Sequence, residues 1–369
     1  MTLQAAAVPP PIRHADQPVA RVMICDDSVV IRGAIARMLE TDPGIRVVAR
    51  AANGAAALAE LQRQPIDVIV LDIEMPVMDG LTALPLLLKA DPSVRIIMAS
   101  TLTTRGADIA LQALRLGAAD YVPKPSTAAI LDDSFRRELL AKIRGLARIR
   151  RATQHGPGAM PKVAHPAFPA RAASRVRASL LAIGSSTGGP QALFTLVQGL
   201  GPTLSVPVVL TQHMPRTFTR ILAEHLTKLG GMPCHEAEHG EQLEAGQIYL
   251  APGDQHLCVD ANPAGLRARL TADAPENFCR PSVDPMLRSA SLACGGRVLM
   301  VMLTGMGQDG LAATRELIQA GGTALAQDEA TSVVWGMPGA ITQAGLCHAV
   351  LPLPLLATKI RDILEPRTR

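Results

Sequence analysis

The chain has 369 residues, which is more than one hydrophobic core usually organises, so we expect two domains. Its apolar fraction of 48% supports globular folding, and a net charge of only +4 gives no reason to expect a general nucleic-acid binder. The six cysteines are dispersed without a C-x-x-C pair, which fits reduced thiols. Neither a signal-peptide core nor a run of about 18 apolar residues occurs, so we predict a soluble cytoplasmic protein.

The first half of the chain alternates apolar strands with amphipathic helices. A proline-containing tail, residues 1–20, is expected to be disordered. The expected strands are 21–25, 45–50, 66–71, 94–98 and 120–122, and the expected helices are one from about residue 28, then 54–64, 81–90, 107–116 and 133–151. This alternation favours a parallel, doubly wound sheet whose site lies at the carboxyl ends of its strands.

Three carboxylates follow strands that should be neighbours in such a sheet. Asp26 and Asp27 follow the first strand, and Asp72 follows the third. Like charges at close range repel, so a bridging cation is expected, and an all-oxygen site suits Mg²⁺. Lys124 and Ser100 follow the fifth and fourth strands and bring an ammonium and a hydroxyl to the same edge. A carboxylate between Mg²⁺ and a lysine is well placed to attack a phosphoryl donor, although an unrelated α/β site or a surface cluster of acids remains an alternative.

These residues also match a known family. The shared motifs are Asp26-Asp27, residues 72–80, Ser100-Thr101 and Lys124-Pro125. The set resembles the receiver domain of two-component response regulators, over residues 21–145. The resemblance implies a flavodoxin-like fold in which Asp72 takes a phosphoryl group from a histidine kinase. It also implies that Asp26, Asp27 and Asp72 hold Mg²⁺, that Lys124 contacts the phosphoryl group, and that Ser100 and Tyr121 are switch residues.

A basic connector separates the two halves. No acidic residue occurs from Leu139 to Ala223, and glycine and proline interrupt the first part of that stretch. We therefore interpret residues 146–178 as a flexible basic linker. It is either a contact for an acidic partner or for the other domain, or a solvated connector, which is the simpler interpretation.

The second half begins with an apolar strand, 180–184, that runs into a glycine-rich turn. Gly184, Ser186 and Gly188 have the G-x-S-x-G spacing, which lifts a serine hydroxyl above a sheet where backbone amides approach it. The helix expected from Gln191 to Gly199 aims its first amides at the same place. A phosphate-binding or purely structural turn is the alternative.

Two later residues favour the catalytic interpretation. His213 follows the expected strand 206–210, and Asp309 lies in a turn after the expected strand 297–303, where it could instead cap a helix starting at about Gly310. With Ser186 they form a nucleophile, a base and an orienting acid. The order Ser, His, Asp differs from that of the α/β-hydrolases, which disfavours a standard lipase or esterase fold. Amides near Thr187 or Met306 are candidates for an oxyanion hole.

The second half carries its own resemblance, through these motifs: Ser186–Pro190, Gln212–Pro215, Tyr249–Gly253, Arg280–Asp284 and Leu303–Gly310. They resemble the catalytic domain of the CheB-type chemotaxis protein-glutamate methylesterases, over residues 179–369. The resemblance implies a second doubly wound, Rossmann-like three-layer α/β domain, with Ser186, His213 and Asp309 as its triad and Met306 in the oxyanion region. It implies hydrolysis of glutamate methyl esters, and deamidation of particular glutamines, on the cytoplasmic helices of methyl-accepting chemoreceptors. No cofactor, nucleic acid or membrane insertion is implied for this half.

The two resemblances together suggest regulation. We hypothesise that the unphosphorylated receiver covers the serine site and that phosphorylation of Asp72 opens it or repacks it productively. Two alternatives stay open at this point. One is the same hydrolase in a chemosensory array that does not control swimming, and the other is a response regulator with a non-catalytic binding output.

Overall fold

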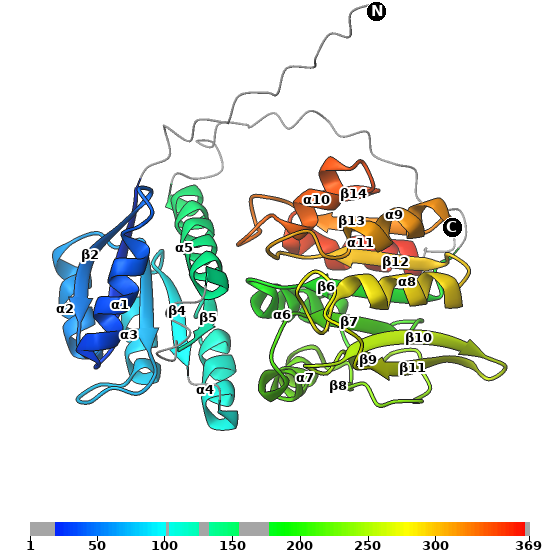
Figure 1. The fold of residues 1–369 in the computed structure, drawn as a ribbon, viewed down its shortest axis with the longest axis horizontal. Coiled ribbons are helices and arrows are strands. Elements are labelled where there is room, and N and C mark those ends of the chain that lie inside the picture. Colours follow the sequence, from blue (N-terminus) through cyan, green and yellow to red (C-terminus); the bar gives the residue numbers. More distant parts are fainter. Residues whose placement is uncertain (1–18, 101–102, 125–132, 155–176, 366–369) are drawn as a thin grey trace, which may run out of the picture.

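The computed structural model describes residues 19–100, 103–124, 133–154 and 177–365, and every structural statement below concerns those residues. They form two α/β domains, coloured blue to cyan-green and green to red in Figure 1. The tail up to residue 18, Thr101, Pro125 and residues 155–176 of the expected linker lie outside the described residues. No helix among those described has the length and apolar character that crossing a bilayer demands.

The first domain is the expected doubly wound parallel sheet, with strand order β2-β1-β3-β4-β5. Its strands are β1 Ala20–Cys25, β2 Ile45–Ala51, β3 Val68–Asp72, β4 Arg95–Ser100 and β5 Asp120–Pro123. Its helices are α1 Val29–Leu39, α2 Gly54–Arg63, α3 Gly80–Ala90, α4 Thr104–Arg115 and α5 Asp133–Gln154. Buried side chains of α1 and α5 pack with one face of the sheet, and those of α2, α3 and α4 pack with the other.

Short polar residues start four of these helices. Ser28, Asn53, Asp79 and Thr103 each accept a hydrogen bond from the backbone amide three residues later. These N-caps satisfy amides that the first helical turn leaves unpaired, and each contributes about 1 kcal/mol. They fix where each of these four helices begins.

The start of the expected linker was wrong, because α5 continues to Gln154. Arg150, whose side chain is only 3% exposed, pairs with Asp67 and Asp91 at 2.7 Å each. Arg148 pairs with Glu329 of the second domain at 2.6 Å. These arginines find acidic partners distant in sequence, so a basic local composition does not make this stretch a solvated connector.

The second domain is built on a seven-stranded parallel sheet with strand order β14-β13-β12-β6-β7-β9-β8. Its strands are β6 Leu180–Ser185, β7 Val208–Gln212, β8 Cys234–Glu236, β9 Ile248–Leu250, β12 Val298–Met302, β13 Thr323–Gln327 and β14 Ala349–Leu351. A separate antiparallel hairpin is formed by β10 His256–Asn262 and β11 Gly265–Thr271. The helices are α6 Gly189–Leu200, α7 Arg216–Gly230, α8 Val283–Ala293, α9 Leu311–Gln319, α10 Met337–Gln343 and α11 Leu353–Leu364.

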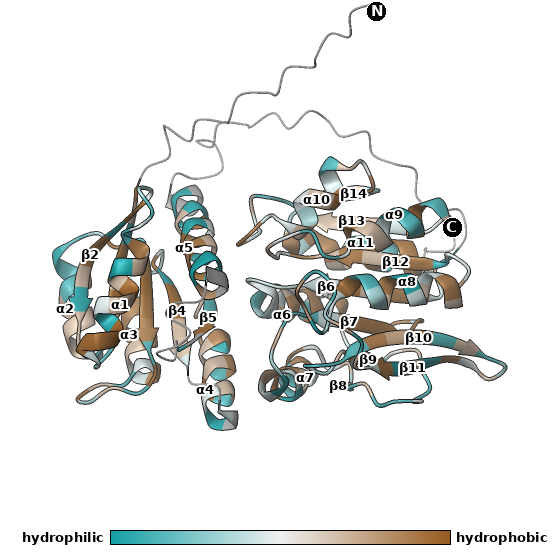
Figure 2. Ribbon diagram, viewed as in Figure 1, coloured by the Kyte–Doolittle hydropathy of each residue, from teal (hydrophilic) through white to brown (hydrophobic). Residues whose placement is uncertain are grey.

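The order of these strands determines where the site forms. Helices α6, α7 and α11 cover one face of the sheet, while α8, α9, α10 and the hairpin cover the other. Strands of both sheets are mainly apolar in Figure 2, as burial on two faces requires. Strand β6 pairs with β12 on one side and β7 on the other, so the chain reverses its direction of growth there. Such a switch point is where open α/β sheets bind ligands.

The two domains are in direct contact through α4, β5 and α5 of the first and α6, α7 and the segment after β13 of the second (Figure 1). The ring of Tyr121 stacks on that of Phe218 in α7, with centroids 4.7 Å apart. Gln191 in α6 donates from Nε2 to two backbone carbonyls near the end of α4, each at 2.8 Å. The interface therefore includes Tyr121, one of the expected switch residues.

Candidate active site and phosphorylation site

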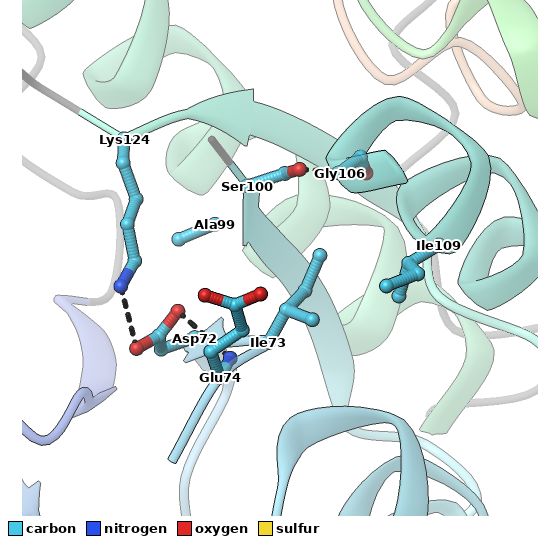
Figure 3. A pocket seen from close by; sticks show the side chains of 8 residues that line it. All are labelled: Asp72, Ile73, Glu74, Ala99, Ser100, Gly106, Ile109 and Lys124. Atoms are coloured by element: carbon cyan, nitrogen blue, oxygen red, sulfur yellow. Dashed lines mark hydrogen bonds and ion pairs between the residues drawn. The ribbon is translucent and has the colours of Figure 1, made fainter. Parts of the chain in front are cut away.

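The three carboxylates of the first domain meet at one edge of its sheet. Asp72 ends β3, while Asp26 and Asp27 follow β1, which pairs with β3. One oxygen of each lies within 4.8 Å of the others. Lys124 Nζ lies 2.6 Å from Asp72 Oδ2 and 3.6 Å from Asp26 Oδ2, and Figure 3 shows Lys124 reaching towards Asp72. The predicted cluster is thus assembled as the strand order required.

In this environment the negatively charged state of the cluster is energetically unfavourable unless a further cation is bound. Burial, together with repulsion from Asp26, raises the pKa of Asp72 to about 6 despite the opposing effect of Lys124. Asp26 Oδ2 is buried without a hydrogen-bond partner among the described residues, although it lies within ion-pair range of Lys124. Closely spaced carboxylate oxygens, one of them unsatisfied, fit the ligand preference of Mg²⁺.

The two expected switch residues lie in different places. Ser100 lines the pocket beside Asp72 in Figure 3 and donates from Oγ to the carbonyl of Gly106 at 2.7 Å. Tyr121 is buried against the second domain instead. The carboxylates therefore have Ser100 as a polar neighbour within the pocket. The aromatic residue, Tyr121, lies two strands away from β3, at the interface with the second domain.

In the second domain, glycines allow the turn that carries Ser186. Gly188 has φ 74°, and a Cβ there would lie 2.5 Å from Val333 Cγ2. A Cβ at Gly189 would lie 1.9 Å from Gln212 Oε1. A larger residue at either position would move the turn, so the Gly-rich sequence after Ser186 follows from close packing as well as conformation.

His213 and Asp309 meet across the sheet. His213 follows β7 and Asp309 follows β12, the two strands that flank β6, and His213 Nε2 lies 2.7 Å from Asp309 Oδ2. Because Asp309 engages Nε2, the nitrogen left to take a proton from a nucleophile is Nδ1, and Cys279 Sγ lies 3.4 Å from it. No hydrogen bond joins Ser186 Oγ to His213 within the described part of the chain. The described structure therefore pairs His213 with Asp309 but does not pair Ser186 with His213.

Asp309 has a second structural role, which differs from the alternative considered above. The first turn of α9 is bonded by another carboxylate, because Asp284 Oδ1 accepts from the Ala313 amide at 2.8 Å, whereas Asp309 accepts hydrogen bonds from Ser282 Oγ at 2.7 Å and from the Val283 amide at 2.6 Å. It therefore caps α8, not the helix after Gly310. Burial alone would raise the pKa of Asp309, but the bonds from His213 and from the start of α8 hold it below its usual range. Burial would lower the pKa of His213, yet its contacts with Asp309 and Cys279 raise it.

The expected oxyanion residues flank Ser186. Thr187 is buried, and its carbonyl accepts from Thr304 Oγ1 at 2.9 Å. Met306 is 38% exposed and follows Gly305, where an added Cβ would lie 2.9 Å from Ser186 Cβ. The backbone at Thr187 and at Gly305 therefore lies beside Ser186.

Two family models match different parts of the chain. Residues 22–136 match the response regulator receiver domain model, and residues 181–360 match the CheB methylesterase model. A Rhodospirillum centenum protein named protein-glutamate methylesterase/protein-glutamine glutaminase of group 2 operon is 52% identical, over 94% of this chain and 94% of its own. An Azospirillum brasilense protein named protein-glutamate methylesterase/protein-glutamine glutaminase is 51% identical, over 96% of each chain. The chain belongs to the CheB methylesterase family.

Among solved structures, the catalytic domain of Thermotoga maritima CheB methylesterase is 36% identical, covers 51% of this chain and 99% of its own, and has a TM-score of 0.49. In this member of the CheB methylesterase family, three further residues lie at the candidate site that the sequence did not predict as site residues. They are Gln212, which donates from Nε2 to the Ser186 carbonyl at 2.9 Å, and Asn277 and Cys279, which contact Asp309 and His213. Gln212 stands within a motif noted above, but Asn277 and Cys279 lie on a loop with no periodic pattern, and only the folded chain brings them to the site.

Proposed function

We infer that this chain is a phosphorylation-regulated serine hydrolase that removes methyl esters from glutamates of methyl-accepting chemoreceptors and deamidates particular glutamines there. The names of its relatives support the activity. The observation that carries the assignment is the His213–Asp309 pair, 2.7 Å apart, on the segments that follow the two strands flanking β6, the strand that runs into Ser186. Since receptor modification takes place on cytoplasmic helices, the enzyme acts in the cytoplasm.

Both reactions are acyl transfers at a side-chain carbonyl. Ser186 Oγ attacks the carbonyl carbon while His213 Nδ1 takes its proton, and the oxyanion forms against amides near Thr187 and Met306. Asp309 fixes the tautomer of His213 and stabilises its protonated form. His213 then protonates the leaving group, so methanol departs from an ester and ammonia from a primary amide. Water attacks the acyl-serine, with His213 again taking the proton, and the glutamate carboxylate is released.

The receiver domain controls this site. Asp72 accepts a phosphoryl group from the chemotaxis histidine kinase, and Asp26, Asp27 and Asp72 hold Mg²⁺, which when bound neutralises charge on the phosphoryl oxygens. Lys124 Nζ, already 2.6 Å from Asp72, contacts the same group. Ser100 and Tyr121 respond to it as switch residues.

Several contacts support restraint of the serine turn by the unphosphorylated receiver. Asp120 Oδ2 accepts a hydrogen bond from the Gly188 amide at 3.1 Å, two residues after Ser186. The neighbouring Tyr121 stacks on Phe218, in the helix that begins three residues after His213. Phosphorylation shifts the domains towards a state in which Ser186 and His213 pair.

The test is methanol release from methylated receptor membranes by wild type and by Ser186→Ala, each with and without a small phosphoryl donor and Mg²⁺. We expect donor-stimulated release by wild type and none by Ser186→Ala. Equal activity of the two proteins would remove Ser186 from the mechanism. Release that depends on Ser186 but ignores the donor would keep the hydrolase and remove its control by the receiver.

One relative suggests a second setting for the same chemistry. The Rhodospirillum centenum protein is named for a group 2 operon. The same hydrolase could serve an array other than the one that controls swimming, and deletion of the gene, followed by assays of swimming and of surface motility, separates the two.

A further inference from the structure

A strained turn stands beside the catalytic residues. Glu276 and Cys279 exchange two backbone hydrogen bonds, at 3.1 and 3.0 Å, and the two residues between them have positive φ angles, 54° at Asn277 and 63° at Phe278. This is the conformation of a two-residue hairpin turn in which both central residues are left-handed. Asparagine suits that conformation, but a bulky aromatic residue rarely adopts it. The backbone of Phe278 adopts the left-handed conformation although phenylalanine disfavours it.

Both neighbours of Phe278 contact the catalytic pair. Asn277 Nδ2 donates to Asp309 Oδ1 at 2.8 Å and to Asp284 Oδ2 at 2.8 Å. Cys279 Sγ lies 3.4 Å from His213 Nδ1. Consecutive Cα atoms are about 3.8 Å apart, so the backbone of Phe278 is at the rim of the active site. The anchors on both sides fix the direction in which its side chain leaves the backbone.

The ring of Phe278 does not contribute to the packing of the described chain. Its exposed fraction is 102%, the highest among the exposed large apolar residues of the described chain, and this holds with both domains in contact. An exposed ring adds nothing to the core, while its backbone conformation costs stability. Met306, also partly exposed, lies on the other segment beside Ser186. Apolar side chains therefore stand on two segments around the reactive group.

We propose that Phe278 is a specificity-determining residue that packs on an apolar side chain of the receptor helix carrying the glutamate to be hydrolysed. This rests on the proposed function. On a helix, residues three or four apart lie on one face, so an ester side chain entering the site brings a neighbour from the adjacent turn to its rim. Packing of the exposed phenyl ring on such a neighbour removes apolar surface from water and so favours binding. An isolated glutamyl ester has no neighbouring side chain for the ring to cover.

The test compares two substrates. One is a soluble, methylated cytoplasmic fragment of a receptor, and the other is the methyl ester of a single capped glutamate. Phe278→Gly removes the ring and suits a φ of 63°, so this variant keeps the turn. Phe278→Tyr retains the ring as a rescue, and Leu292→Gln, at an 80% exposed position towards the end of α8, is the matched control for loss of an exposed apolar side chain.

For the receptor fragment, we expect Phe278→Gly to lower kcat/KM about tenfold, through KM, because partial burial of one aromatic ring is worth about that factor. The single-glutamate ester should be hydrolysed as by wild type, and Phe278→Tyr and Leu292→Gln should match wild type on both substrates. The stimulation by a phosphoryl donor should not change.

Three outcomes would overturn the proposal. An equal loss on both substrates would mean that the turn acts through His213 and Asp309. No loss on either would mean that the ring touches no substrate. With methylated receptor membranes added as a third substrate, a loss seen there and not with the soluble fragment would assign the ring to lipid. If wild type itself released no methanol from the fragment, the proposed function would fail first and this inference with it.

Discussion

Gly145 in α5 offers a direct way to test how the receiver restrains the hydrolase. A Cβ at this position would lie 1.7 Å from the Val333 carbonyl oxygen, whereas real Cβ contacts essentially never fall below 3.0 Å. Gly145→Ala therefore forces α5 and the segment around Val333 apart by about 1.3 Å, an overpacking that typically costs about 1–3 kcal/mol. That segment also touches the serine turn, because Val333 packs against Gly188.

The substitution acts on the contact between domains and not on the fold of either. Alanine is better than glycine inside a helix by about 0.5–1 kcal/mol, so α5 itself gains stability. At about 1.4 kcal/mol for each factor of ten, the packed arrangement loses roughly 5- to 150-fold in population relative to the separated one. We expect methanol release without a phosphoryl donor to rise at least about fivefold, and the further stimulation by the donor to shrink accordingly.

The assay measures methanol release by wild type, Gly145→Ala and Gly33→Ala, with and without donor. Gly33 is the matched control, since it lies in α1 of the same domain and a Cβ there meets only the Arg37 side chain at 3.5 Å. Gly33→Ala should behave as wild type. The reasoning is refuted if Gly145→Ala leaves the unstimulated rate unchanged, or if it lowers the rates with and without donor alike.

Two further predictions concern the sites themselves. Asp309→Asn should lower kcat by about 10⁴-fold, as loss of the orienting acid does in serine proteases, and should let the raised pKa of His213 fall, so the acid limb of the pH–rate profile moves to lower pH; an acid limb that stays in place would show that Asp309 does not set the pKa of His213. Asp72→Ala should abolish stimulation by a phosphoryl donor while leaving the unstimulated rate within about twofold, and removal of Mg²⁺ with EDTA should do the same to wild type. Stimulation that persists in either case would exclude Asp72, or the cation, from the control step.

Sequence alone predicted the placement of Ser186, His213 and Asp309 because that placement follows from parallel strands. Ser186 and His213 directly follow β6 and β7, Asp309 lies on the segment that follows β12, and parallel neighbours put their carboxyl ends at one edge. The predicted ends of the strands agree less well with the structure. The strand expected at 206–210 is β7 Val208–Gln212, since Pro207 has no amide to donate to a ladder. The contacts that sequence could not give join residues far apart in the chain, such as Arg148 with Glu329 and Asn277 with Asp309.

The capping of α8 by Asp309 bears on how an inactive form of the enzyme should be made for capturing its substrate. Replacing Asp309 would free the Val283 amide and Ser282 hydroxyl that it now accepts from, and would loosen the start of a helix together with the loop that carries Asn277. Ser186 has no such structural role, since its hydroxyl makes no hydrogen bond within the described residues. A substrate trap is therefore better built at Ser186, where chemistry is lost and the recognition surface is kept.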